Sequence, residues 1–489
     1  MLHLFTNTDN NCIITYIKQK LNLMTSIKIK LTILVFILAT LPLMGFGCKF
    51  SENNDVEELY KPIELNWWGV WEETADVANL IGAYQTLHPN IKVKYRKFRF
   101  EEYENELTKA WLEQRGPDIF SIPSTQLREY QNLIKPMPSS MKLPFVEMKG
   151  TVKKEPTIVI KTIVGLTAKK VQELFIQAVS EQVIINNDVY GLPLSVDTLA
   201  LYYNRDLLNS AKIPLPATTW AELIEHVKNL TIFDTNGNIQ QSAIALGSAE
   251  NIPRAIDILS LLMVQNGAQM VNENNYITFN ESPAGQNKFY PGKDALEFFV
   301  DFIDPTKEVY SWDEDQPDAL QMFASGKLAY FIGYAYQAPI IKAQSPKLNF
   351  NIAPMLQTIP DVQEINFADF WTITTYFGAE ENKIAPAWDF IRYITTTPDL
   401  TKEYLNKSKQ PTALRSLIND QILMEDVGVF ANQTINAQTW YRGYDWKETE
   451  NAMTDLIYEA THNISSDSTT LDLLNLVARR INQTINKPK

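Results

Sequence analysis

The sequence predicts an α/β protein with two lobes. Residues 63–122 alternate strand, helix, strand, helix and strand, which is typical of a parallel sheet with crossover helices. A second α/β block follows at residues 219–332. The 489-residue chain shows no internal repeat and is too long for one small domain, whereas two domains accommodate it easily.

The spacing of apolar residues predicts each element of the first block. Residues 63–70 are a short apolar-rich run, which is typical of a strand. Apolar side chains recur at helical spacing over residues 77–87 and predict an amphipathic helix that a proline ends. Residues 91–95 alternate as a strand, residues 103–111 return to the helical period, and residues 118–122 predict a further buried strand.

The second block is recognised by its helix boundaries. Thr219–Glu222 is a capping box, in which side chains bind the free amides at the start of a helix, here the helix over residues 223–230. Helical spacing also marks residues 296–303, and residues 317–325 predict a short helix closed by a glycine. Residues 328–332 predict a buried strand.

Three other segments complete the chain. Pro386 is predicted as the first residue of a helix that carries Trp388, because proline suits that position. Residues 448–485 predict two helices packed on the outside. Residues 137–180 lack a clear period until about Val171–Val179, and they predict a surface insertion that ends in a helix; a long loop without function is the alternative.

The N-terminus has the pattern of a secretion signal. Lys28 and Lys30 precede an apolar run over residues 31–44, and small residues then lead to Cys48. A cysteine at this place is similar to the bacterial lipoprotein signal, in which the thiol receives a diacylglyceryl group and becomes the new N-terminus. An uncleaved N-terminal anchor helix is the alternative.

This pattern divides the beginning of the chain into parts. We expect residues 1–47 to be removed and Cys48 to be lipidated. Residues 1–23 lie ahead of the pattern, which suggests that the start codon is assigned too early. Residues 48–61 are polar and acidic and predict a tether between the lipid and the folded body.

Composition narrows the possible partners. The net charge is −13, and it becomes −16 without residues 1–47, which hold four lysines and one aspartate. An acidic protein repels phosphate backbones, so we expect no nucleic-acid partner. Cys12 and Cys48 are the only cysteines and the histidines are scattered, so we expect no metal and no cofactor. Asp234–Asn238 begins like a calcium loop but lacks the glycine and glutamate required later in it, which predicts a turn.

Several segments resemble the extracellular solute-binding proteins of ABC transporters, in particular the sugar-binding branch that includes maltose-binding protein. Their order and spacing match from Leu65 to about Asn482. Each segment is a weak signal alone, whereas five in order are specific. The segments are Trp68–Glu72, Gly116–Phe120, Tyr190–Leu207, Thr219–Trp220 and Phe323–Ala329.

The resemblance implies two lobes around an interlobe cleft, joined by a hinge that the chain crosses several times. It places these crossings near Ser195–Asp197, just after Gly333–Tyr334 and near Tyr393–Ile394. The N-terminal lobe is then expected to comprise residues 62–196 and 345–394, and the C-terminal lobe residues 197–344 and 395–489.

Ligands of open α/β sheets bind beyond the C-terminal ends of the strands, so side chains after each predicted strand are candidates. A sugar needs aromatic planes against its apolar face and carboxylates or amides along its hydroxyls. We assign Trp68, Trp220 and Trp388 to packing and leave out Asp118, which follows Gly-Pro and suits a backbone contact. The predicted ligand-binding residues are Trp71, Glu72, Ser124, Thr125, Asp197, Tyr334, Tyr336, Asp369, Trp371, Trp440 and Trp446.

These observations predict a lipid-anchored, extracytoplasmic and monomeric receptor. It is expected to capture a sugar or oligosaccharide by hinge closure and to deliver it to an ABC permease, with no catalytic residue. A non-sugar solute such as a peptide, a polyamine or a phosphorylated compound is an alternative. A secreted glycoside hydrolase is the rival from another class, because it too needs aromatic platforms and paired carboxylates.

Overall fold

The computed structural model describes residues 59–150, 155–286, 288–358, 364–462 and 467–486. The chain divides into two units, residues 1–61 and 62–489, and the second is described below. The predicted signal segment and Cys48 lie outside the described residues. Within the described part, no helix is long and apolar enough to cross a membrane.

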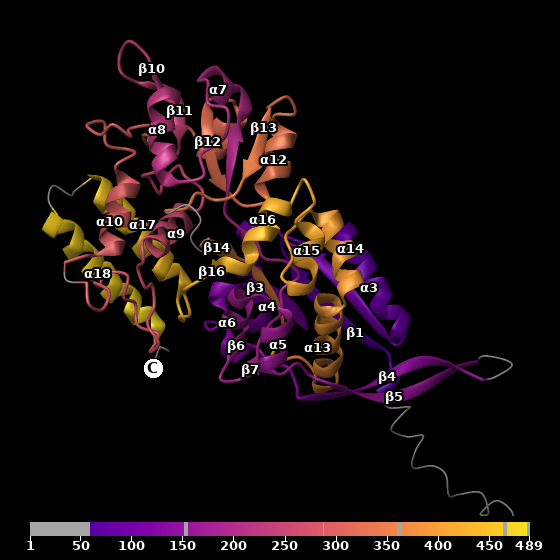
Figure 1. Ribbon diagram of the computed structural model, residues 1–489. Helices are drawn as coiled ribbons and strands as arrows, with labels where there is room; N and C mark the ends of the chain where they lie inside the picture. Colours follow the sequence, from indigo (N-terminus) through magenta and orange to yellow (C-terminus); the bar gives the residue numbers. More distant parts are fainter. Residues whose placement is uncertain (1–58, 151–154, 287, 359–363, 463–466, 487–489) are drawn as a thin grey trace, which may run out of the picture. The chain divides into compact units, whose positions relative to one another are not determined.

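A first sheet has the strand order β15-β3-β1-β2 (Figure 1). Strands β1, β2 and β3 are parallel and β15 runs antiparallel to β3. This confirms the predicted strand–helix alternation. The elements are β1 (Ile63–Gly69), α3 (Thr74–Leu87), β2 (Ile91–Lys97), α4 (Phe100–Leu112), β3 (Ile119–Pro123) and β15 (Trp371–Thr375).

A second sheet has the order β10-β11-β12-β9-β13. Its strands are β9 (Ala200–Asn204), β10 (Ile232–Phe233), β11 (Ile239–Ile244), β12 (Leu328–Gly333) and β13 (Phe350–Ala353). The helices of this region are α7 (Arg205–Ser210), α8 (Trp220–Leu230), α9 (Ala255–Gln265), α10 (Pro291–Val300), α11 (Ala319–Ala324), α12 (Gln337–Gln344), α17 (Trp446–His462) and α18 (Asp467–Ile485). Thr219 is the N-cap of α8, because its Oγ1 accepts a hydrogen bond from the Glu222 amide at 3.2 Å. The Glu222 carboxylate accepts from the Thr218 amide at 2.7 Å, so the reciprocal bond of the predicted capping box comes from one residue earlier.

Each of these two sheets has its own hydrophobic core. We call the residues packed around the first sheet the first lobe and those packed around the second sheet the second lobe. The first crossing between lobes falls between Val196 and Leu199, where the resemblance implied it. The second falls at Phe367–Ala368, and the third falls between Ile418 and Phe430. The expected boundaries at 345 and 394 are therefore wrong.

Packing explains both displaced boundaries. Strand β13 pairs with β9 and so belongs to the second sheet. The helix α14 (Pro398–Ser408) buries Tyr404 and Leu405 in the first core and so belongs to the first lobe. A small sheet of β16 (Ala437–Gln438), β14 (Asn366–Asp369) and β8 (Asp197–Thr198) lies at the crossings. The short helices α15 (Ile418–Gln421) and α16 (Gly428–Gln433) span the third crossing.

The insertion is more regular than predicted. It begins with a long antiparallel hairpin of β4 (Ser140–Lys149) and β5 (Glu155–Val164). Two helices follow in place of one, α5 (Ala168–Leu174) and α6 (Gln177–Val183), and then the two-stranded ribbon of β6 (Ile184–Ile185) and β7 (Asp188–Val189). The hairpin has no clear sequence period because apolar side chains occupy both of its faces.

The helix α13 (Glu381–Thr396) contains Pro386 in its interior, so the prediction of Pro386 as its first residue is wrong. Proline lacks an amide hydrogen, which leaves one carbonyl of the preceding turn without its helical donor. Trp388 is fully buried, and Trp68 and Trp220 are almost fully buried, as expected for residues assigned to packing. The predicted pair of C-terminal helices is confirmed as α17 and α18.

Candidate interlobe binding site

A cavity of about 600 Å³ is lined by residues of both lobes. Nine of the eleven predicted ligand-binding residues line it: Trp71, Glu72, Thr125, Asp197, Tyr336, Asp369, Trp371, Trp440 and Trp446. Ser124 and Tyr334 do not line it. The polar and aromatic side chains predicted to follow the strands therefore gather at one place.

An aromatic cluster of Trp71, Phe100, Tyr103, Trp371 and Tyr336 forms one wall of the cavity. Trp71 follows β1, and its ring centroid lies 5.8 Å from that of Phe100 and 6.0 Å from that of Trp371. Trp71 is 43% exposed and Phe100 is 57% exposed, so both rings keep free surface. Large exposed rings beside a cavity are available to a ligand.

This aromatic cluster joins the two lobes. Tyr336 belongs to the second lobe, and its ring lies 5.8 Å from the Trp71 ring of the first lobe. Tyr334 is fully buried and stacks on Tyr336 at 6.1 Å. Tyr334 therefore supports the ring that faces the cavity and does not itself face it.

Asp197 lies on β8, within the first crossing. Its Oδ1 accepts hydrogen bonds from the amides of Thr198 at 2.8 Å and Ala335 at 3.0 Å, and its Oδ2 accepts one from the Tyr336 amide at 3.3 Å. Burial raises the pKa of Asp197 to about 7, although these amides oppose the rise. Its carboxylate thus ties the first crossing to the segment that carries Tyr336.

A charged network centred on Arg254 was not predicted from the sequence. Arg254 precedes α9 with a left-handed backbone, φ 62°, which is uncommon for a residue other than glycine. Its Nε lies 2.6 Å from Asp257 Oδ2 and its Nη2 lies 2.8 Å from Asp369 Oδ2. Asp369 lies between two residues of the first core, so this guanidinium connects the two lobes.

The buried partner in this network is Asp257, which is 3% exposed. It also accepts a hydrogen bond from the Tyr334 hydroxyl at 2.7 Å. Burial raises the pKa of Asp257, and Arg254 opposes that rise. Neither the left-handed backbone of Arg254 nor its contact with Asp369 leaves a local sequence signal, whereas Phe100 could have been found as an aromatic residue just after the second strand.

Two further candidates, Glu72 and Ser124, are largely buried. Glu72 is almost buried, and its carboxylate accepts a hydrogen bond from the Tyr95 hydroxyl at 3.3 Å. Burial raises the pKa of Glu72. Ser124 is buried at the start of a short 3-10 helix after β3, and its amide donates to the Phe370 carbonyl.

The two C-terminal tryptophans differ in what they can offer a ligand. Trp440 is 6% exposed and its Nε1 donates to Ser260 Oγ at 3.1 Å, so most of its ring packs in the second core. Trp446 begins α17 and is partly buried.

The Asp234–Asn238 segment is the predicted turn. Asp234 Oδ1 accepts hydrogen bonds from the amides of Asn236 at 2.7 Å and Asn238 at 2.9 Å. Throughout the described ranges, no group of three or more His, Cys, Asp or Glu side chains is placed to hold a metal ion. Asp118, left out as a candidate, accepts from the Asn66 amide at 2.8 Å and pairs with Lys383 at 3.2 Å, which is a structural role.

The fold is that of two-lobed binding proteins in solved structures. The cyclic α-maltosyl-1,6-maltose binding protein from Arthrobacter globiformis matches with a TM-score of 0.66 and 15% identity, over 87% of this chain and 99% of that one. An ABC substrate-binding protein from Listeria monocytogenes in complex with cycloalternan matches with a TM-score of 0.63 and 15% identity, over the same shares.

The chain belongs to the family of bacterial extracellular solute-binding proteins, whose model matches residues 79–431. The galactooligosaccharide-binding protein of Bacillus subtilis is 24% identical over 187 residues, which is 38% of each chain. Maltodextrin-binding protein MdxE of the same organism is 25% identical over 255 residues, which is 49% of this chain and 54% of that one. The chain thus spans about half or less of the length of these curated relatives.

Proposed function

We propose that this protein binds a neutral oligosaccharide between its lobes and delivers it to an ABC permease, without chemical change to the ligand. The aromatic cluster is the observation that carries the proposal. Rings from both lobes face one cavity, and sugar rings present the apolar C–H faces that pack on such surfaces. The relatives named above are binding proteins for galactooligosaccharides and maltodextrins, which agrees with this ligand class.

Charge pairing inside the cavity supports a neutral ligand over a phosphorylated one. Asp197 is engaged by three backbone amides, and Asp257 and Asp369 share Arg254. Lys447 pairs with Glu450 at 2.9 Å. A phosphate would need free guanidinium or ammonium groups, and the two basic side chains of the lining, Arg254 and Lys447, are both committed to carboxylates.

The same pairing argues against a glycoside hydrolase. Such an enzyme needs two carboxyl groups that flank the scissile bond and can exchange protons with substrate or water. The acidic residues of the hinge region are held by backbone amides or by Arg254. Hydrolysis of a chromogenic glycoside by the purified protein would contradict the binding role.

In this proposal the lobes close because a ligand contacts both only when they are together. Trp71 lies in the first lobe and Tyr336 in the second, so a sugar that packs against both stabilises the closed state and shifts the population towards it. A diacylglyceryl group on Cys48 keeps the receptor beside the permease. Mass spectrometry of membrane-extracted protein would show whether the chain begins at an acylated Cys48.

Isothermal titration with maltooligosaccharides, galactooligosaccharides and spermidine tests the ligand class. The Phe100→Ala variant is expected to weaken saccharide binding roughly tenfold, because a ring that packs on the ligand is lost. Phe377→Ala is the matched control, since Phe377 is 59% exposed, close to the 57% of Phe100, and lies outside the cavity lining. Binding of spermidine without any saccharide, or equal effects of the two variants, would refute the proposal.

A further inference from the structure

The β4–β5 hairpin has an apolar face that lies outside both hydrophobic cores of the described chain. Figure 1 shows its outer half extending beyond the helices of the first lobe. Cross-strand pairing places Val146 opposite Ile158 and Met148 opposite Pro156 on one face, with Ile160 next to them. Met148 is 58% exposed. Among the described residues, neither hydrophobic core includes these side chains or packs against them.

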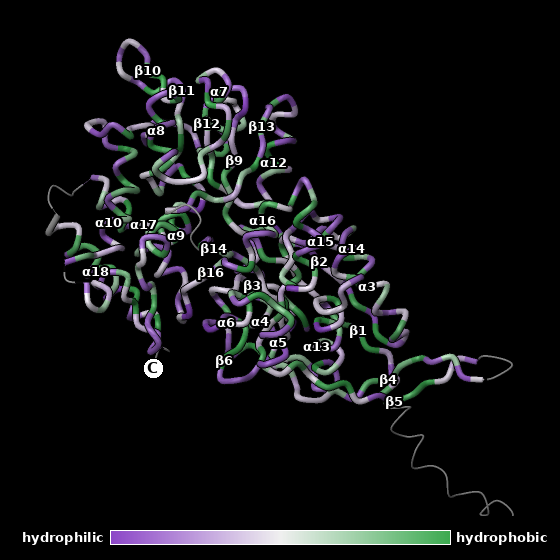
Figure 2. The backbone as a smooth tube through the Cα atoms, viewed as in Figure 1, coloured by the Kyte–Doolittle hydropathy of each residue, from purple (hydrophilic) through white to green (hydrophobic). Residues whose placement is uncertain are grey.

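The opposite face of the hairpin packs on the first core at its root and carries charged side chains. Phe145 packs on the first core and on His88, with ring centroids 4.3 Å apart. Farther out, Lys161 pairs with Glu147 at 2.7 Å. The outer half of the hairpin therefore has charged side chains on one face and an apolar strip on the other. Figure 2 shows hydrophobic residues in both strands of the hairpin.

The charge of this region is opposite to that of the whole chain. Residues 135–170 contain eight lysines, two glutamates and no other charged residue, whereas the chain has a net charge of −13. Lys142 of β4 is exposed on the same face as the apolar strip, whereas the exposed Lys149 lies opposite Glu155 on the other face. An apolar strip among lysines on an otherwise acidic protein fits an anionic bilayer surface, where the apolar side chains enter the interface and the lysines meet the headgroups.

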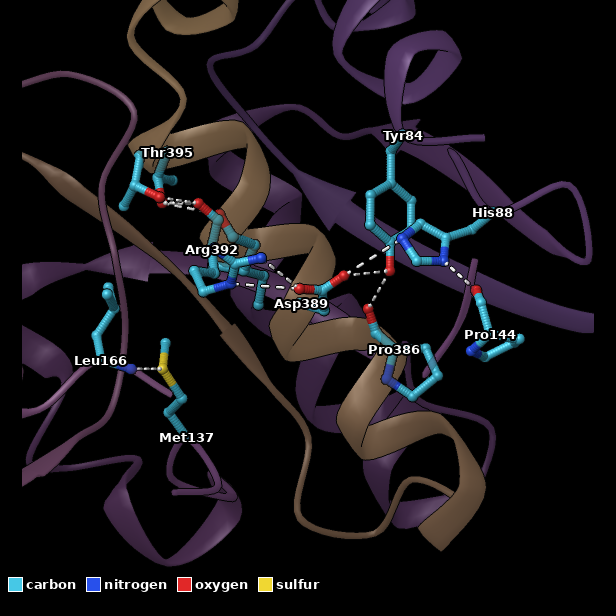
Figure 3. Close-up of polar contacts among 11 residues, drawn as sticks. Tyr84, His88, Met137, Pro144, Leu166, Pro386, Asp389, Arg392 and Thr395 are labelled. Carbon is cyan, nitrogen blue, oxygen red and sulfur yellow. Dashed lines mark hydrogen bonds and ion pairs between the residues drawn. The ribbon is translucent and has the colours of Figure 1, made fainter. Parts of the chain in front are cut away.

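The root of the hairpin is fixed to the lobe. His88 Nδ1 lies 2.9 Å from the Pro144 carbonyl, and the Leu166 amide donates to Met137 Sδ at 3.1 Å (Figure 3). Gly165 packs so closely that an added Cβ would lie 2.0 Å from the Pro138 carbonyl oxygen. A rigid root holds the outer half in a defined direction.

The root also lies beside the start of the folded body. The Ile63 amide donates to the Asn90 carbonyl at 2.8 Å, two residues after His88. Five residues of strand separate Pro144 from Lys149, which is about 17 Å. Only 15 residues separate Cys48 from Ile63, a span of at most about 50 Å. A chain tethered at Cys48 thus keeps the hairpin within reach of the membrane.

We propose that the apolar strip of Val146, Met148, Pro156, Ile158 and Ile160, with Lys142 on the same face, docks on an anionic lipid bilayer and orients the receptor there. Tethering alone limits distance but leaves orientation free. A second contact at the hairpin would restrict the directions in which the cleft can face. This contact is independent of the ligand class and of the cleft residues.

Co-sedimentation with vesicles tests the contact. The chain from residue 48 with Cys48→Ser has neither lipid nor the apolar N-terminal run, and it retains every residue of both cores, which begin at Leu65. It is expected to bind vesicles of phosphatidylcholine with 30% phosphatidylglycerol, and to bind pure phosphatidylcholine much less. Binding should fall in 0.5 M NaCl, because salt screens the lysines.

Two variants locate the contact on the hairpin. Met148→Glu is expected to weaken partitioning roughly tenfold and Lys142→Gln about fivefold. Leu476→Glu is the matched control, because Leu476 on α18 is 56% exposed, close to the 58% of Met148. All variants should bind saccharide like the parent protein, which separates this test from that of the proposed function.

Three results would overturn the inference. The first is a parent protein that does not bind the anionic vesicles, and the second is equal loss in Met148→Glu and Leu476→Glu. The third comes from sedimentation velocity: a dimer that Met148→Glu converts to a monomer would show that a second copy covers the strip.

Discussion

Replacement of Arg254 by methionine should destabilise the protein because it leaves Asp257 without its cation. Asp257 is 3% exposed, and after the change its only strong donor in the network is the Tyr334 hydroxyl at 2.7 Å. Removing one partner of a buried ion pair typically costs about 3–5 kcal/mol. Arg254 itself is partly exposed, so we expect the lower end, about 3 kcal/mol at pH 8.

The pH dependence of this loss identifies its cause. Burial raises the pKa of Asp257, and loss of Arg254 raises it further. A carboxyl whose pKa is higher in the folded than in the unfolded state loses stability as the pH rises through the folded value. The Arg254→Met variant should therefore be less destabilised at pH 5, where Asp257 can take up a proton, than at pH 8.

Urea unfolding followed by tryptophan fluorescence at both pH values measures the effect. Lys170→Met is the matched control, since Lys170 and Glu173 have the same i,i+3 spacing but are both about half exposed. That change should alter the free energy of unfolding by less than about 0.5 kcal/mol. A cost below 1 kcal/mol for Arg254→Met at pH 8, or the same cost at pH 5, would refute the reasoning.

Two further predictions concern packing and protonation. Trp388→Ala should lower the free energy of unfolding by about 3–5 kcal/mol, because the Trp388 ring is fully buried. Trp71→Ala should change the free energy of unfolding by less than about 1 kcal/mol, because the Trp71 ring is largely exposed. Urea unfolding of the two variants measures the difference. Burial lowers the pKa of His88, so the folded state favours the neutral ring and loses stability as the pH falls below about 6.5. His88→Gln should flatten the dependence of the unfolding midpoint on pH between 7 and 5. His462→Gln is the control: a backbone hydrogen bond to Tyr458 raises the pKa of His462, so this histidine changes stability with pH in the opposite direction. Parallel pH profiles for wild type and His88→Gln would contradict the role assigned to His88.

The sequence was sufficient for the elements with a strong period and for the side chains that follow them. Trp71, Asp369 and Trp371 were placed at one cleft because strands of open sheets share an edge. The positions at which the chain crosses between the lobes were harder to predict from the sequence. Strands β8 and β14 contain two and four residues, too few for a period, and only their pairing shows where the chain changes lobe.

Arg254 shows a second limit. Its pairing with Asp257 follows from helix spacing, but its contact with Asp369 joins residues more than a hundred positions apart. The hairpin shows a third limit. Residues 141–148 alternate between a face that packs on the lobe and a face that does not, yet each face carries three apolar residues and one charged one, so alternation of polarity is absent.

The hinge and the aromatic cluster share one segment, and this bears on how closure could be driven. The Tyr336 amide is bound to Asp197 at the first crossing, while the Tyr336 ring faces Trp71 of the other lobe. A ligand that packs on Tyr336 therefore acts on a segment already tied to the hinge. Shifting an equilibrium from 1:99 to 99:1 requires about 5.5 kcal/mol of differential affinity. Ring stacking contributes about 0.5–1.5 kcal/mol per pair beyond burial, so the rings alone cannot supply the shift. Polar contacts made only in the closed state must supply the rest, and a ligand with hydroxyl groups around an apolar face offers both kinds of contact.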